Sequence, residues 1–214
     1  MLSITNVYKY LGFIADKRIS SQKHFKERCA KMKAEADLFV SVILQMRGVS
    51  MEKKKIMAKA CVNSVILYAT EALSSKALSE KIMEKAEIVQ RRVLRRLLRA
   101  SHTVANETLL FDLGLLSIKG EMDKRLLDFR YKMQDSTNTF IKSIFNINRK
   151  CKLGWEQRCQ DSMAFYNMEP NMEMIEDSRC RLKKIKDMEC MHRLRRLEVE
   201  VPKKQLFTGR SPRP

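Results

Sequence analysis

Apolar residues between Ser21 and Met46 recur at alternating steps of four and three. The apolar positions are Phe25, Cys29, Met32, Ala36, Phe39, Ile43 and Met46. Because successive residues of an α-helix are about 100° apart, this spacing puts them on one narrow face. The pattern predicts a long amphipathic helix. Lysines lie on its other faces, mostly in its first half, so the helix also presents a basic surface.

A second helix is predicted over about Met51–Leu73. Gly48 suits the end of the preceding helix, and Ser50 can act as the N-cap of the new one. The stretch Ala60–Ala69 is apolar on nearly every side. We therefore expect this part of the chain to lie at the centre of a helical bundle.

The segment Glu80–Arg99 separates charged from apolar positions most sharply. It would be about 30 Å long if helical throughout. In a helical projection its arginines fall within an arc of about 140°, and the opposite side is aliphatic. The arginines are Arg91, Arg92, Arg95, Arg96 and Arg99, and the aliphatic positions are Val93, Leu94, Leu97 and Leu98. The sequence predicts a helix with one core face and one cationic face.

Further helices are predicted along the rest of the chain. A loop at Ser101–Asn106 precedes a short helix at Glu107–Asp112. The next helix has the apolar face Ile118, Met122, Leu126, Phe129 and Met133. Later helices are predicted at Thr139–Asn146, from Trp155 onward, and from Met172 to about Glu200. The last segment is strongly basic and has only a loose apolar stripe. This composition favours a helix that orders on a partner.

The N-terminal stretch Asn6–Asp16 shows no helical period. Its aromatic and branched residues around Gly12 favour a short strand pair. The predicted fold is thus mainly α-helical, a helical bundle with a short β strand pair at the N-terminus. The predicted regions are a residual β entry at 1–18, the bundle at 19–150, a basic helical segment at 151–201 and a disordered tail at 202–214.

The charge of the chain favours polyanionic partners. Lys and Arg number 43 against 25 Asp and Glu among 214 residues, a formal net charge of +18. The longest uncharged apolar run, Ala60–Thr70, is well short of the roughly 20 residues needed to span a bilayer. No export signal follows Met1. We therefore expect nucleic acid rather than a membrane as partner, and a location in the nucleus or the cytoplasm.

Other chemistry finds little support in the sequence. The six cysteines form no CxxC pair, and the spacing of Cys180, Cys190 and His192 fits no zinc pattern. The three histidines belong to no hydrolase motif, and no glycine-rich phosphate loop is present. We therefore predict that the chain contains no metal site, no cofactor site and no catalytic residue.

The arginine face is the first candidate binding surface. Guanidinium groups suit bidentate contact with phosphate, and five of them on one face repel each other unless an anion lies alongside. The candidate residues are Arg91, Arg92, Arg95, Arg96 and Arg99. The alternative is a solvated face whose arginines pair with acidic residues such as Glu84 and Glu87.

Four segments, in order, resemble the C-terminal portion of a non-LTR (LINE-type) retrotransposon reverse transcriptase. The segments are YLGFIADKRISSQKHF from Tyr10, SVILYATEAL from Ser64, EIVQRRVLRRLLR from Glu87, and ETLLFDLGLLSIKGEMDKRLLDFRYKM from Glu107. The first is similar to the family's junction between palm and thumb, and the others to segments of and after the thumb. The resemblance spans roughly Asn6–Asn146 and weakens from Cys151 onward.

The resemblance implies a thumb-like helical bundle, a module that grips the backbone of a template-primer duplex. On that basis Lys23, Lys26 and Lys31, on the helix after the YLG motif, would contact nucleic acid. The parent family is an RNA-directed DNA polymerase whose palm holds two metal ions on an Asp-Asp turn. This chain has no Asp-Asp pair, and the Cys/His knuckle of some members is also absent. We therefore expect no polymerase activity from the chain alone.

The leading hypothesis is a catalytically inactive fragment, derived from such a reverse transcriptase, that binds RNA, DNA or a hybrid duplex through phosphates. One alternative is a truncated piece of a full-length RNA-directed DNA polymerase. The other is a helical protein-protein interaction module. If Val7–Ile14 normally lies against a palm sheet, the chain should self-associate or bind a palm-domain partner.

Overall fold

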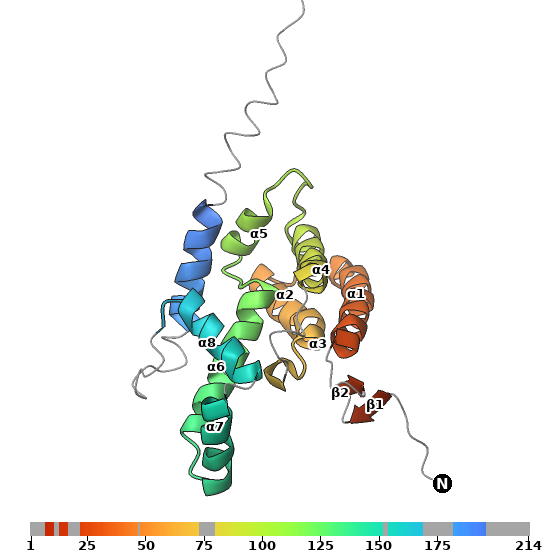
Figure 1. Cartoon of the computed structure of the whole chain (residues 1–214). Helices are drawn as coiled ribbons and strands as arrows, with labels where there is room; N and C mark the ends of the chain where they lie inside the picture. Colours follow the sequence, from red (N-terminus) through yellow and green to blue (C-terminus); the bar gives the residue numbers. More distant parts are fainter. Residues whose placement is uncertain are drawn as a thin grey trace, which may run out of the picture.

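The fold is mainly α-helical, as the sequence predicts. The computed structural model describes residues 7–10, 13–16, 22–46, 48–72, 80–151, 154–168 and 182–195 (Figure 1). The α-helices are α1 (Gln22–Gln45), α2 (Met51–Ala58), α3 (Ser64–Ile66), α4 (Glu80–Leu98), α5 (Asn106–Asp112), α6 (Ile118–Gln134), α7 (Thr139–Cys151), α8 (Gly154–Phe165) and an unlabelled helix at 182–195. The predicted tail at 202–214 lies outside the described residues.

A small hairpin precedes α1. Strands β1 (Val7–Tyr10) and β2 (Phe13–Asp16) pair in antiparallel fashion, with Tyr10 opposite Phe13. The Ile14 N–H donates to Nδ1 of His24 on α1 at 3.3 Å. His24 is fully buried, and this burial lowers its pKa below 6.5. The hairpin is thus attached to the first turn of α1.

Helix α1 confirms the predicted apolar face with one exception. The six positions from Phe25 to Ile43 are buried along one side of the helix. Met46 is exposed, so its assignment to the core was wrong. The helix ends at Gln45, one residue earlier, and the chain turns away toward Gly48, which has a φ of +82°.

The predicted second helix begins as expected but ends early. Ser50 caps α2, because its side chain accepts the Lys53 N–H at 3.5 Å. A π-helical turn, η1 (Lys59–Asn63), joins α2 to α3, which ends at Ile66. A 3-10 turn, η2 (Thr70–Ala72), follows.

The position of this second helix in the bundle also differs from the prediction. One side of it is buried, at Val62, Ile66 and Leu67. Ala60 and Cys61 are exposed, so this stretch is not enclosed on every side. The reason is that Ala60 and Cys61 face outward, while the branched side chains of Val62, Ile66 and Leu67 are buried in the core beside α1.

The apolar side chains form two core clusters. The first joins α1, α2, η1, α3, α4 and α5, and it includes Ile118 and Met122 at the start of α6. The second contains Leu126 and Leu127 of α6 together with residues of α8, and Ile185 of the 182–195 helix. Helix α6 therefore belongs to both clusters and connects the two halves of the fold (Figure 1).

Part of the predicted apolar face of α6 was wrong. Phe129 is exposed and Met133 only partly buried, whereas Arg130 and Tyr131 are buried. The buried positions Ile118, Met122 and Leu126 step by four, and continuing that step leads to residue 130 rather than 129. The prediction was wrong because Arg130, a charged residue, occupies the next position of the buried face.

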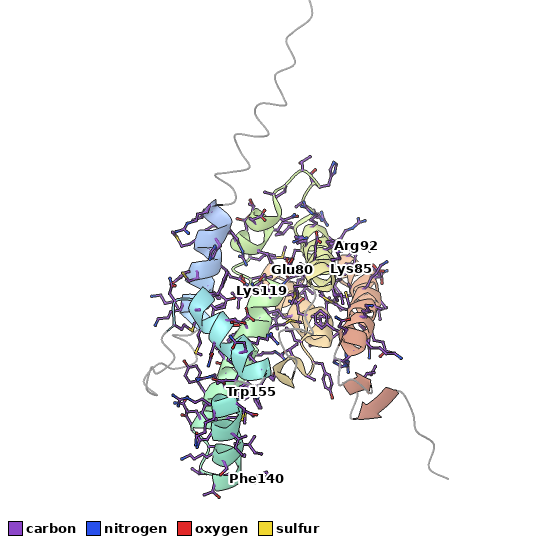
Figure 2. The ribbon with its side chains drawn as sticks, viewed as in Figure 1. Glu80, Lys85, Arg92, Lys119, Phe140 and Trp155 are labelled. Carbon is purple, nitrogen blue, oxygen red and sulfur yellow. The ribbon has the colours of Figure 1, made fainter. Side chains whose placement is uncertain are left out.

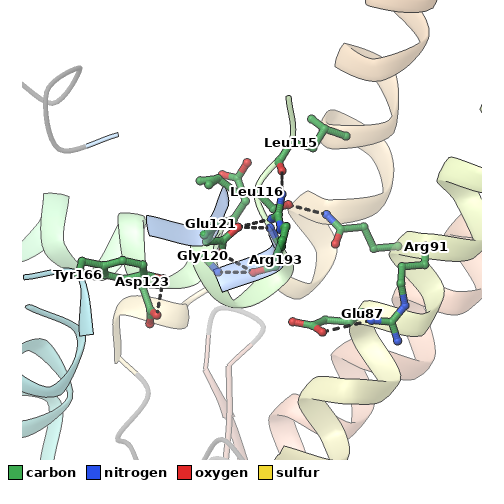
Figure 3. Close-up of polar contacts among 12 residues, drawn as sticks. Glu87, Arg91, Leu115, Leu116, Gly120, Glu121, Asp123, Tyr166 and Arg193 are labelled. Atoms are coloured by element: carbon green, nitrogen blue, oxygen red, sulfur yellow. Dashed lines mark hydrogen bonds and ion pairs between the residues drawn. The ribbon is translucent and has the colours of Figure 1, made fainter. Parts of the chain in front are cut away.

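The 182–195 helix packs on the body of the protein. Ile185 is fully buried in the second cluster. Glu189 accepts the Ser117 N–H at 3.0 Å and also bonds the Ser117 hydroxyl at the start of α6. Arg193 donates to the Leu115 carbonyl at 3.2 Å (Figure 3). The remainder of the predicted segment Met172–Glu200 lies outside the described residues.

Candidate nucleic-acid interface

Helix α4 provides the candidate interface, and its positive charge is concentrated toward its C-terminal end. Its first half carries acidic residues, including Glu80 and Glu84, together with the lysines Lys81 and Lys85, and the arginines occupy its second half. This order suits the helix dipole, which favours anions near the N-terminus and cations near the C-terminus. Val93, Leu94 and Leu97 are buried, as predicted. The arginines are left on the opposite face.

All five predicted arginines line one hollow at the C-terminal end of α4. The hollow has a volume of about 750 Å³. Its lining consists of Leu44, Ile88, Arg91, Arg92, Arg95, Arg96, Arg99, Ala100, Ser101, His102 and Asn106. We call this site the arginine hollow. Among the described residues no acidic side chain lines it, so it is a concentrated positive surface.

Two of these arginines have carboxylate partners. Arg91 lies 3.4 Å from Glu87, one turn earlier on α4 (Figure 3). Arg92 lies 3.0 Å from Asp37 on α1, and side chains of this pair are 55% and 50% exposed. Ion pairs with such exposure contribute only about 0–1 kcal/mol. An anion of higher charge could therefore displace Asp37 at little cost.

Arg95 holds the loop between α4 and α5. Its guanidinium donates to the Ser101 carbonyl at 2.6 Å, the Val104 carbonyl at 2.8 Å and the Asn106 side chain at 2.7 Å. These acceptors are uncharged, so the positive charge of Arg95 is not neutralised by them. Arg95 thus fixes one wall of the arginine hollow and adds charge to it.

Arg96 and Arg99 are exposed, and neither forms an ion pair within the described residues. Arg99 has a left-handed backbone with a φ of +52°. It follows the last helical residue of α4, and the next N–H, of Ala100, bonds the Arg95 carbonyl at 2.9 Å. Glycine is the usual residue at this position of a helix end, so an arginine there carries backbone strain.

Of the three predicted lysines, only Lys26 lines a hollow next to the arginines. Lys23, Lys26 and Lys31 are all exposed on α1. Lys26 lies in a second hollow, between α1 and α4, of about 610 Å³. We call this the lysine groove, and it is lined by Lys26, Cys29, Ala30, Lys33, Ile82, Lys85, Ile88, Val89 and Arg92. Lys23 and Lys31 line neither hollow.

The lysine groove and the arginine hollow adjoin each other. Ile88 and Arg92 line both of them. Figure 2 shows Lys85 and Arg92 on the part of α4 that lies beside α1. A basic surface therefore follows the α1–α4 contact along most of α4.

Sequence reasoning missed a group of buried charges in the second half of the fold. Arg130 of α6 and Glu156 of α8 are 3.2 Å apart, with side chains 3% and 0% exposed. The Arg130 guanidinium also lies 5.5 Å from the centre of the Phe145 ring of α7. Arg130 thus joins three helices. The four-residue step of the α6 apolar face is the signal that could have located it.

A second buried pair links α6 to α8. Arg158 lies 3.5 Å from Asp123 and donates to the Thr70 carbonyl at 3.0 Å. Tyr166 donates to Asp123 at 3.2 Å (Figure 3). Burial raises the pKa of Asp123 and lowers the pKa of Arg158, and the attraction between the two groups opposes both shifts. Both side chains are only 6% exposed and are paired with each other, and they line the inner side of a hollow of about 710 Å³.

Other site types are not formed within the described residues. They contain no cluster of three or more His, Cys, Asp or Glu side chains that could hold a metal ion. Cys180 lies outside the described residues. None of the described helices combines the length and apolar character required to cross a membrane.

Comparison with protein-family models, curated proteins and solved structures found no match to this chain. The resemblance to reverse transcriptases therefore stays an interpretation of the four sequence segments.

Proposed function

We propose that this protein binds nucleic acid through backbone phosphates, with the arginine hollow as its main contact surface. The observation that carries the proposal is the convergence of five guanidinium groups in one hollow without a lining carboxylate. Like charges in one hollow repel each other, and a polyanion removes that repulsion. Guanidinium also fits phosphate by paired hydrogen bonds.

The proposal assigns different tasks to the arginines. Arg96 and Arg99 are exposed and contact phosphates directly. Arg92 exchanges its weak pair with Asp37 for a phosphate. Arg95 keeps the α4–α5 loop in place and contributes charge. The left-handed strain at Arg99 supports a functional reason for an arginine at that position.

The lysines of α1 extend the same surface. Lys26 lies next to the arginine face through the lysine groove. Lys23 and Lys31 are exposed but line neither hollow, so we propose that they act through the general positive potential around the site. Such a potential raises the rate of association with a polyanion rather than fixing its position.

We further propose that the bundle is thumb-like and derives from a non-LTR reverse transcriptase. The support is the order of the four segments, together with the position of α1, which follows the YLG motif and packs beside α4. The ligand would be an RNA, DNA or hybrid duplex, met in the nucleus or the cytoplasm. The proposed role is binding without catalysis, and the truncated polymerase piece stays an alternative.

The experiment compares two triple variants in a duplex-binding assay. The first changes Arg92, Arg96 and Arg99 to Gln, which removes three charges from the arginine hollow and spares Arg95. The control changes Lys183, Lys186 and Arg195 to Gln, which removes three exposed charges from the 182–195 helix. We expect the first triple to weaken binding at least tenfold and the control to weaken it much less. Equal weakening would refute the proposed site.

A further inference from the structure

The floor of the lysine groove differs from that of the arginine hollow. It is formed by aliphatic and thiol side chains, namely Cys29, Ala30, Ile82, Ile88 and Val89. The arginine hollow instead includes the polar residues Ser101, His102 and Asn106. Ile88 is 50% exposed although it lies between two packed helices. The lysine groove therefore offers apolar surface that gains from being covered.

This floor is poorly suited to nucleic acid. Proteins that hold unpaired bases use aromatic rings for stacking, and none of the described residues that line the groove is aromatic. A phosphate placed on an aliphatic floor would lose hydration without gaining a hydrogen bond there. The floor is instead suited to aliphatic side chains of a partner.

The rims of the groove are cationic on both sides. Lys26 and Lys33 form the α1 rim, and Lys85 and Arg92 form the α4 rim. On each rim the two cations are seven residues apart, or about 10 Å along the helix. In the part of the chain that the structure describes, no acidic side chain lines the groove. A matching ligand has apolar groups in the middle and carboxylates on both flanks.

We propose that the lysine groove binds an acidic amphipathic helix of another protein. Apolar side chains on one face of that helix lie on the floor at Ala30 and Ile88, and its flanking Glu and Asp residues pair with the rim cations. This is the helix-in-groove mode of recognition, in which apolar anchors recur at three- and four-residue steps. The proposal does not rest on nucleic-acid binding, because its apolar anchors lie on a floor that is poorly suited to phosphate and that includes Ala30, which does not line the arginine hollow.

The test uses two synthetic peptides and the full chain. The first is a fluorescein-labelled helical peptide with Leu at steps of four and three and Glu on both flanks. The second is identical except that every Leu is Ser, so its charge is unchanged. We expect the Leu peptide to bind at least tenfold more tightly in fluorescence anisotropy, because only it covers the floor.

Variants of the chain locate the peptide. Ala30→Glu places a bulky anion in the floor, and Ala30 is exposed, so the fold should tolerate it. We expect at least a tenfold loss of Leu-peptide affinity, and a similar loss when Lys26 and Lys85 are both changed to Gln. The control is Ile56→Ser on α2. Ile56 is an apolar residue, 63% exposed, that lies outside the groove, so this change should leave the affinity for the Leu peptide unchanged.

Three results would overturn the proposal. The first is equal binding of the two peptides, which would mean that charge alone attracts them. The second is full affinity of the Ala30→Glu variant for the Leu peptide. The third is failure of the Leu peptide to bind while Ala30→Glu weakens binding of a nucleic-acid duplex, which would assign the groove to nucleic acid.

Discussion

The arginines of α4 and those near α8 have the same side chain in opposite surroundings. Arg96 and Arg99 are exposed in a hollow that no carboxylate of the described residues lines. Arg130 and Arg158 are almost fully buried, and each has a carboxylate within 3.5 Å. Arg96 and Arg99 are therefore available to an external anion, whereas Arg130 and Arg158 are each paired with a carboxylate inside the protein.

The difference shows that a count of basic residues does not locate a binding surface. A buried guanidinium must be paired, because an isolated charge in the interior is strongly unfavourable. An exposed guanidinium needs no internal partner, and the free energy of its contact with phosphate becomes available on binding. Burial and the nearest carboxylate therefore separate structural arginines from those that can bind.

The largest expected effect comes from removing one member of a buried pair. Arg130→Met leaves Glu156 fully buried without its partner, so the free energy of unfolding should fall by about 3–5 kcal/mol. The matched change Arg96→Met, on the exposed side of α4, should alter it by less than about 0.5 kcal/mol. Urea denaturation measures both values. Similar losses for the two variants would contradict the distinction between them.

A smaller effect is expected where α6 meets the 182–195 helix. A Cβ atom added at Gly120 would collide with the Glu189 carboxylate. Gly120→Ala should therefore cost about 1–3 kcal/mol and speed amide hydrogen exchange in residues 182–195. The same change in a Glu189→Ala background should be nearly neutral. A full loss in that background would show that another contact is responsible.

The smallest effect is expected at Arg99, and it has opposite signs for stability and binding. Arg99→Gly removes the strain of a left-handed arginine and should raise the free energy of unfolding by about 1 kcal/mol. It should also weaken duplex binding, since a charge leaves the arginine hollow. Gly114→Ala, at the left-handed end of α5, should lower stability by a similar amount. Lower stability of Arg99→Gly would show that the arginine side chain stabilises this turn.

Much of the fold could be predicted from apolar spacing. Apolar residues recur at regular steps along α1 and α4. The predicted bounds of α1 are one residue too long at each end, and those of α4 are one residue too long at the C-terminal end. The arginine face of α4 was predicted as well, because a helix of known period fixes which side chains share a side. These features are local, so the sequence contains the information.

The remaining features depend on contacts between distant segments. The pairs of Arg130 with Glu156 and of Arg158 with Asp123 join residues 26 or more positions apart. The hydrogen bond from Arg95 to the Val104 carbonyl likewise depends on the position of the α4–α5 loop, which the helical pattern does not give. The separation of Lys23 and Lys31 from the arginines depends on how α1 packs on α4, which a helical projection does not give.

The salt dependence of duplex binding tests the central claim most directly. Each phosphate contact contributes about 0.9 to the slope of log affinity against log salt concentration for B-form DNA. Changing Arg92, Arg96 and Arg99 to Gln should therefore reduce that slope by about 2 to 3, while the Lys183, Lys186 and Arg195 triple should reduce it by less than about 1. Equal slopes for both triples would mean that diffuse charge, and not the arginine hollow, binds the nucleic acid.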